Sequence, residues 1–284
     1  MRCRTLLLLL GIITFFSYAS YAQTPALAVR HYEAAEKKRR NEDWSGAVEE
    51  YTRAIELNAH LDPKSWRPKK GTNEQAFDKS QPGSSEIAVS DSFTAYAYTN
   101  RGVARFYLGD LDAALTDFDR ALRIKPKLSE ALSGRAAVRI AKGDHDGALL
   151  DFERALAIND KLVEVYNNRG YLLIDTSDLA KAIEDFDRAI ELKPTMASAH
   201  QGRGLAFMKQ GRFDLAVRDF TSALKLNPGD GNVYGNRGLS FMMLGKEKEA
   251  STDLQKCLEL NPDLKTSLAE RIEMAKKLKQ AKLP

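Results

Sequence analysis

The sequence predicts an all-α fold, a solenoid of stacked helical hairpins, on three observations. A small residue, an aromatic residue and two further small residues recur with a period of 34 residues. A proline closes most of these units, and no strand pattern is evident between them. One hairpin of this length cannot bury its apolar face alone, so a fixed period of this size indicates hairpins that stack on their neighbours.

The repeated positions define five units over residues 95–264. The units begin at Ala95, Ser129, Val163, Ala197 and Gly231. Small residues recur at Gly102, Ala136, Gly170, Gly204 and Gly238, and at Ala114, Ala148, Ala182, Ala216 and Ala250. Phe118, Phe152, Phe186, Phe220 and Leu254 share the aromatic position, followed by Ala121, Ala155, Ala189, Ala223 and Cys257. The closing prolines are Pro126, Pro194, Pro228 and Pro262, with Asp160 as the exception.

The first full unit shows why each element is expected. A first helix carries Gly102, which is small enough to let a paired helix approach. Gly109 then tolerates the left-handed turn, and Asp110 can cap the next helix. Phe118 lies on the apolar face of that second helix. Pro126 ends it, because proline cannot continue a helix.

Residues 23–61 are predicted to form an N-terminal segment and a divergent first repeat. A weaker copy of the pattern runs from Ala28 to Leu61, without the closing proline. The matching residues are Ala35, Ala47, Tyr51 and Ala54. We therefore expect about six repeats, with the first less regular than the others.

Residues 1–22 have the pattern of a signal peptide. Arg2 and Arg4 precede an apolar run, and Ser20-Tyr21-Ala22 offers small residues for cleavage before Gln23. The alternative is an uncleaved membrane anchor, since the uncharged stretch is close to the shortest length that spans a bilayer. Cleavage and export are the main prediction.

Two other segments lie outside the repeats. Residues 62–94 are rich in proline, glycine and polar residues and are predicted to form a flexible insertion. Residues 265–284 are predicted to form a C-terminal capping helix that closes the last apolar face. Its apolar side is expected to carry Leu268, Ile272, Ala275 and Leu278.

These recurring residues resemble the tetratricopeptide repeat family, over six units of 34 residues or about 204 residues. The resemblance implies a right-handed superhelical solenoid. One departure is systematic, because arginine stands where the family usually has leucine. Each arginine has an aspartate sixteen residues later: Arg101 and Asp117, Arg135 and Asp151, Arg169 and Asp185, Arg203 and Asp219, Arg237 and Asp253. We predict a ladder of structural ion pairs rather than independent exposed charges.

Composition and motifs give no sign of catalysis. The 43 basic and 39 acidic residues leave a formal net charge of +4, too balanced to indicate nucleic acid or a membrane surface as a partner. The four histidines have no metal-ligand spacing, and no phosphate-binding loop is present. We expect no cofactor and no metal. His200 is interpreted as a core residue, and Cys257 as an inert buried thiol.

The first helices are predicted to provide a binding face for a protein or peptide. In the family this face lines the concave groove of the solenoid. The predicted contact residues are Asn100, Phe106, Asn168, Tyr171, Met208, Asn236 and Met242. The asparagines recur in alternate units and could bond a peptide backbone. Gly134 and Gly202 interrupt this series.

The sequence therefore predicts a non-catalytic scaffold or adaptor that binds polypeptide. The resemblance extends to bacterial tetratricopeptide proteins, so with the signal peptide it implies a periplasmic or secreted location. One alternative is a cell-envelope assembly factor anchored by an uncleaved N-terminal segment. A second is an enzyme whose chemistry lies in residues 62–94, and a third is that Trp66 and its neighbours fold back as a self-inhibitor.

Overall fold

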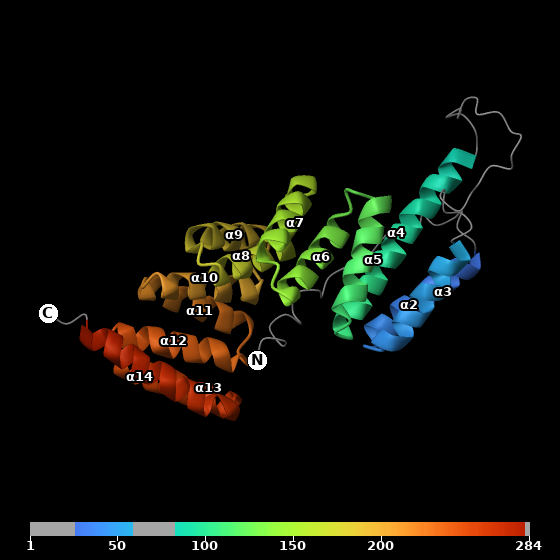
Figure 1. The fold of residues 1–284 in the computed structure, drawn as a ribbon. Helices are drawn as coiled ribbons and strands as arrows, with labels where there is room; N and C mark the ends of the chain where they lie inside the picture. The colour runs from blue at the N-terminus through green and yellow to red at the C-terminus, as the bar shows by residue number, and fades with distance from the viewer. Residues whose placement is uncertain (1–25, 59–82, 282–284) are drawn as a thin grey trace, which may run out of the picture. The chain divides into compact units, whose positions relative to one another are not determined.

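The structure is a computed structural model that describes residues 26–58 and 83–281. Over these residues the chain forms α-helices and one short 3-10 helix, with no β-strand (Figure 1). The all-α prediction is confirmed. The predicted signal peptide, residues 1–22, and residues 62–82 of the predicted insertion lie outside the described residues.

The helices follow one another as hairpins. Their bounds are α2 (Ala26–Arg40), α3 (Trp44–Asn58), α4 (Gly83–Tyr107), α5 (Leu111–Ile124), α6 (Ser129–Lys142), α7 (His145–Ile158), α8 (Val163–Asp175), α9 (Leu179–Leu192), α10 (Ala197–Lys209), α11 (Phe213–Leu226), α12 (Gly231–Met243) and α13 (Glu247–Leu260). The 3-10 helix η3 (Pro262–Leu264) then leads into α14 (Lys265–Ala281). Within each predicted repeat the two helices pack against each other.

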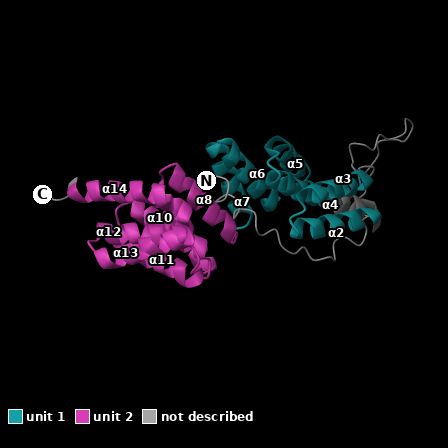
Figure 2. Ribbon diagram, turned by 90° about the horizontal axis from the view of Figure 1, so that it is seen from below, with its two compact units in different colours: residues 1–160 teal, residues 161–284 magenta. Residues whose placement is uncertain are grey.

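The chain divides into two compact units, Met1–Asp160 and Lys161–Pro284 (Figure 2). In the first unit α3 packs on α4 and α5 packs on α6, so each second helix contacts the first helix of the next repeat. In the second unit α9 packs on α10 and α11 packs on α12 in the same way. Each unit is thus a stack of hairpins in itself.

Every hairpin turns through one residue with a positive φ angle. The residues are Glu42, Gly109, Gly143, Ser177, Gly211 and Gly245, with φ between 59° and 83°. Asp110 then caps α5, as expected, by accepting a bond from the backbone N–H of Ala113 at 3.2 Å. The turn and the cap together fix where the second helix begins.

The predicted repeat positions form the core. Ala114, Phe118 and Ala121 are fully buried, as are the matching residues of the next two repeats. The Phe118 ring lies between two glycines. A Cβ atom at Gly102 would lie 3.2 Å from this ring, and one at Gly134, in the next repeat, would clash with it. Glycine at position 134 therefore leaves room for the ring, which explains one interruption of the asparagine series.

The second repeat begins earlier than the sequence indicated. Helix α4 starts at Gly83, so residues 83–94 belong to a helix and not to a flexible insertion. Phe93, which is 1% exposed, packs with Ala28 and Ala54 of the first repeat. This aromatic anchor lies outside the repeat pattern, which is why the pattern did not reveal it.

The capping helix forms as predicted, with one correction. Leu268 and Ala275 of α14 are buried with Leu239 and Met242 of α12, and Ile272 packs at the edge of this cluster. Leu278 is 51% exposed, so it does not belong to the buried side. None of the described helices combines the length and apolar character needed to cross a membrane.

Candidate functional site

The predicted ion-pair ladder is confirmed in all five repeats. Each arginine donates through Nε and Nη2 to both carboxylate oxygens of its aspartate, at 2.6–2.9 Å. The aspartates are between 0% and 5% exposed. This planar two-bond geometry satisfies a buried carboxylate within one hairpin.

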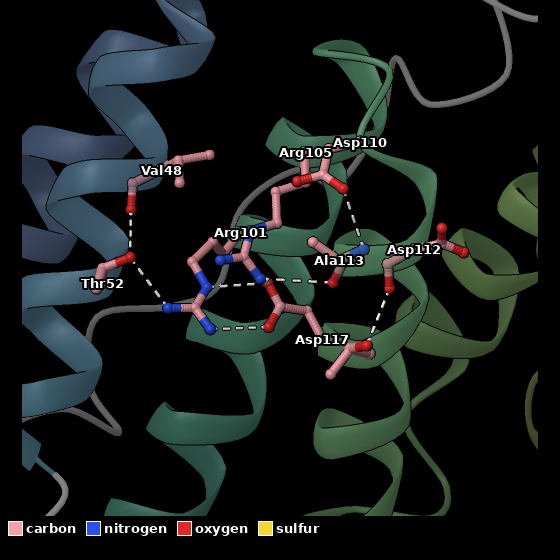
Figure 3. A network of polar contacts seen from close by, with 9 residues as sticks. Val48, Thr52, Arg101, Arg105, Asp110, Asp112, Ala113 and Asp117 are labelled. Carbon is pink, nitrogen blue, oxygen red and sulfur yellow. Dashed lines mark hydrogen bonds and ion pairs between the residues drawn. The ribbon is translucent and has the colours of Figure 1, made fainter.

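The arginines also tie neighbouring repeats together, which the sequence analysis missed. The Nη1 atom of Arg101 donates to Thr52 Oγ1 of α3 at 3.0 Å (Figure 3). Nη1 of Arg135 reaches Asp119 at 2.7 Å, and Nη1 of Arg203 reaches Asp187 at 2.6 Å. Arg237 bonds Thr221 in the same way at 3.1 Å. The signal in the sequence was the polar residue directly after the buried aromatic residue.

In the first unit a second arginine also donates to the aspartate of each arginine–aspartate pair. Nη1 of Arg105 donates to Asp117 Oδ2 at 2.8 Å, and Nη1 of Arg139 donates to Asp151 Oδ2 at 2.8 Å. The hydrogen bonds that Arg135 donates to Asp151 and Asp119 raise its pKa above the ordinary value. The ladder is therefore a structural frame that holds the two helices of each hairpin together.

Asn100 lies inside the first unit and not on an open face. Its side chain is 5% exposed, and its Nδ2 donates to Tyr32 Oη at 2.6 Å and to Glu36 Oε1 at 3.0 Å. Glu36 also accepts a bond from Tyr51. Both partners of Asn100 come from α2. The prediction that Asn100 contacts a peptide is thus corrected, because a buried amide bonds its neighbours.

The other two asparagines of the series are buried as well. Asn168, 5% exposed, accepts a bond from Asn167 Nδ2 at 3.3 Å. Asn236, 6% exposed, accepts a bond from Arg271 Nη2 of α14 at 2.5 Å. Met242 is 8% exposed beneath the same helix. The structure does not leave these three predicted contact residues open to a ligand.

Three predicted contact residues remain partly exposed. Phe106 lies with its ring edge-on to Tyr107, at 5.9 Å between centroids, and Tyr107 stacks on Trp44. Tyr171 packs edge-on to Phe186, and its hydroxyl donates to the carbonyl oxygen of Ser198 at 2.8 Å. Burial raises the pKa of the Tyr171 hydroxyl.

Met208 is the third, and it lies on a stripe of α10. Gln201, Leu205 and Met208 are half-buried at positions one and two turns apart, so they share one side of the helix. Leu205 and Met208 pack at the edge of the core around Phe220. Lys209 beside them is exposed. With Tyr171 of the adjacent helix α8, these residues form what we name the α8–α10 face.

The described residues contain no group of three or more side chains suited to hold a metal ion. His200, interpreted as a core residue, is mostly buried, and its Nε2 lies 3.0 Å from the carbonyl oxygen of Pro194. Cys257 is buried, and burial raises the pKa of its thiol. A thiol of this kind is less reactive than an exposed one.

Family models match several parts of the repeat region. Residues 95–128 and 197–230 match one tetratricopeptide repeat model, residues 170–211 match a TPR repeat model, and residues 231–264 match a third model of the same repeat. The chain belongs to the tetratricopeptide repeat family. These repeats and the fold support a protein-interaction scaffold. No curated protein matches the chain.

Solved structures share the fold at low sequence identity. YrrB, described as a TPR protein with an unusual peptide-binding site, is 23% identical over 64% of this chain and 92% of its own, with a TM-score of 0.53. A MamA structure is 23% identical over 58% of this chain and 96% of its own, also at 0.53. MamA from Desulfovibrio magneticus RS-1 is 19% identical over 60% of this chain and 96% of its own, with a TM-score of 0.55. This level of identity establishes the tetratricopeptide fold and nothing finer.

Proposed function

We propose that the protein is a non-catalytic scaffold that binds a polypeptide segment on the α8–α10 face. The observation that carries the proposal is the half-exposed stripe of Gln201, Leu205 and Met208 beside Tyr171. Apolar side chains with a flexible methionine and an amide suit an extended or helical peptide with hydrophobic anchors. Tetratricopeptide scaffolds are generally non-catalytic, which agrees with this role.

The test begins with peptides selected from a random 12-residue display library against the full chain. The decisive variant is Leu205→Asn with Met208→Asn, because it removes the apolar anchors and leaves the Tyr171 hydroxyl bond intact. Its matched control is Leu226→Asn on a different helix, α11, where the leucine is 41% exposed. Binding is measured by fluorescence anisotropy, and helicity by circular dichroism.

We expect the double variant to bind at least about tenfold more weakly, since a few buried anchors carry most of the energy of an interface. The control should bind as the parent chain does. If the double variant keeps its affinity while remaining helical, the α8–α10 face is not the binding site. Crosslinks from a selected peptide should then map to another surface.

We further propose that the protein is exported to the periplasm or secreted. The support is the basic and apolar pattern of residues 1–22. N-terminal sequencing of the mature protein separates this proposal from the membrane-anchored alternative. A mature chain that starts at Gln23 supports export, whereas one that keeps the apolar run of residues 6–16 supports the anchor.

A further inference from the structure

Helix α14 leaves uncovered a side that is covered in the first helices α4, α6, α8, α10 and α12. The five residues 34 positions apart on this side are at most 3% exposed: Ala104, Val138, Leu172, Ala206 and Ser240. Met274 continues the series and is 65% exposed. In the repeats this side packs on a second helix, as Ala104 does against Ala47 and Tyr51 of α3. In α14 nothing among the described residues takes that place at Met274.

Arg271 continues the arginine ladder without a carboxylate. It stands 34 residues after Arg237, but its described bond is to the amide oxygen of Asn236, and no described carboxylate forms an ion pair with it. Desolvation lowers the pKa of Arg271, whereas carboxylate partners raise the pKa of Arg203. Arg271 is therefore the ladder arginine that has no described carboxylate partner.

The sequence of α13 explains why α14 departs from the repeat geometry. Leu254 holds the position of the buried phenylalanine, and Gln255 holds the position from which Asp119 reaches Arg135. The Gln255 amide instead bonds Glu259 at 3.1 Å. Helix α14 also runs through Lys279, the position at which the other hairpins turn, so no second helix folds back on it there.

Arg271, Met274 and Leu278 lie along one side of α14, one and two turns apart. Met274 and Leu278 are 65% and 51% exposed, and Arg271 is also exposed. The helix contains five basic and two acidic residues. The side therefore combines exposed apolar surface with one positive charge, that of Arg271. Three second helices of this chain, α5, α7 and α9, carry a matching pattern, an aromatic residue between two carboxylates.

We propose that this side of α14 binds an acidic amphipathic helix of a partner protein, with a partner carboxylate bonded to Arg271 and an apolar residue on Met274 and Leu278. A second copy of this chain is a poor source for that carboxylate. Its five ladder aspartates are buried and bonded to their own arginines. This surface is separate from the α8–α10 face.

The probe is a synthetic peptide with the sequence of Leu179–Leu192, which carries the acidic–aromatic–acidic run of Asp185, Phe186 and Asp187. A side-chain staple between positions 180 and 184, both exposed in α9, holds it helical, because an isolated helix of this length is marginal in water. The control peptide has Asp185→Asn and Asp187→Asn. Affinity for the full chain is measured by fluorescence anisotropy at low salt.

We expect the parent chain to bind the acidic peptide. The Arg271→Gln and Met274→Glu variants should each bind it at least about tenfold more weakly. The parent chain should bind the control peptide more weakly by a similar factor. Lys277→Gln, on another side of α14, should change the affinity little. Met274 is exposed, so its replacement should leave the melting curve unchanged and any loss of binding can be assigned to the surface.

Three results would overturn the proposal. The acidic peptide could fail to bind, or it could bind equally well to the Arg271→Gln and Met274→Glu variants. The parent chain could also form a dimer that Met274→Glu dissociates in sedimentation equilibrium, which would make a second copy the occupant. The Leu205→Asn and Met208→Asn double variant should bind this peptide normally, so failure here and failure of the proposed function are distinguishable.

Discussion

In the first unit the buried aspartate of a rung (one arginine–aspartate pair of the ladder) accepts hydrogen bonds from two arginines, whereas in the second unit it accepts them from one ladder arginine. Asp117 and Asp151 each hold two guanidinium groups and are fully buried. Asp185, Asp219 and Asp253 each hold one ladder arginine. The second arginine position is taken there by apolar residues, namely Leu173, Phe207 and Phe241.

This difference changes the chemistry of the carboxylate. In the second unit, burial raises the pKa of Asp185 although Arg169 opposes that shift. A guanidinium cannot lose its proton at any ordinary pH, whereas a carboxylate can gain one. The two units should therefore tolerate loss of a rung residue to different extents and with a different dependence on pH.

The largest expected effect comes from removing the aspartate. Asp151→Leu removes the buried carboxylate that Arg135 and Arg139 share, and we expect a cost of about 5 kcal/mol, the upper end for breaking a buried pair. Asp185→Leu leaves one ladder arginine, Arg169, and should cost about 3 kcal/mol. Urea unfolding gives these values, and amide hydrogen exchange shows which hairpin opens.

Equal losses for the two variants would show that the second arginine adds nothing to the rung. The chain contains two compact units, which can unfold separately. If different spectroscopic probes give different midpoints, the unfolding curve is fitted with two transitions. Asp119→Leu provides a control in the first unit, since that side chain is 47% exposed and should cost less.

Removing the arginine instead should give a smaller, pH-dependent loss. Arg169→Met leaves Asp185 buried without its guanidinium, which raises the aspartate pKa further above its unfolded value of about 3.9. The penalty is absent below that unfolded pKa and grows as the pH rises through the folded pKa. We expect a loss of about 2 kcal/mol at pH 7.

The measurement is the free energy of unfolding of Arg169→Met and of the parent chain between pH 4 and pH 7. The difference should shrink towards pH 4. Asp185→Leu serves as the comparison, because Arg169 stays charged over this range and its penalty should not shrink. A difference between Arg169→Met and the parent chain that stays constant with pH would contradict a buried, protonatable Asp185.

The sequence predicted the repeats and the five arginine–aspartate pairs because each recurs with the period, and it predicted the capping helix because apolar residues recur on one side of it. The links from Arg135 to Asp119 and from Arg101 to Thr52 were missed, since they join different repeats and their partners vary. The asparagine series was misread. A face inferred from helical spacing does not show that α2 and α14 supply the partners of Asn100 and Asn236.

Replacing both residues of an arginine–aspartate pair should lower the free energy of unfolding less than replacing one of them. The double variant Arg169→Met with Asp185→Leu removes both charges, and we expect it to lie within about 1 kcal/mol of the parent chain, because apolar residues can substitute for a buried ion pair. The double-mutant cycle gives the coupling energy of the two side chains. Additive losses from the two single variants would mean that the pair does not act as a unit.

The smallest effect concerns the hairpin turns, because each unit has one turn without glycine, at Glu42 in the first unit and at Ser177 in the second. Gly143 in the first unit has a φ of 83°, and Ser177 in the second unit has a φ of 68°. Serine lacks the freedom of glycine in this left-handed region, so Ser177→Gly should stabilise the second unit by up to about 1 kcal/mol. Gly143→Ser should destabilise the first unit by a similar amount, although nothing lies within 4 Å of its Cβ position. Thermal unfolding of both variants tests this: if Gly143→Ser were neutral, backbone strain would not explain why glycine occupies most of these turns.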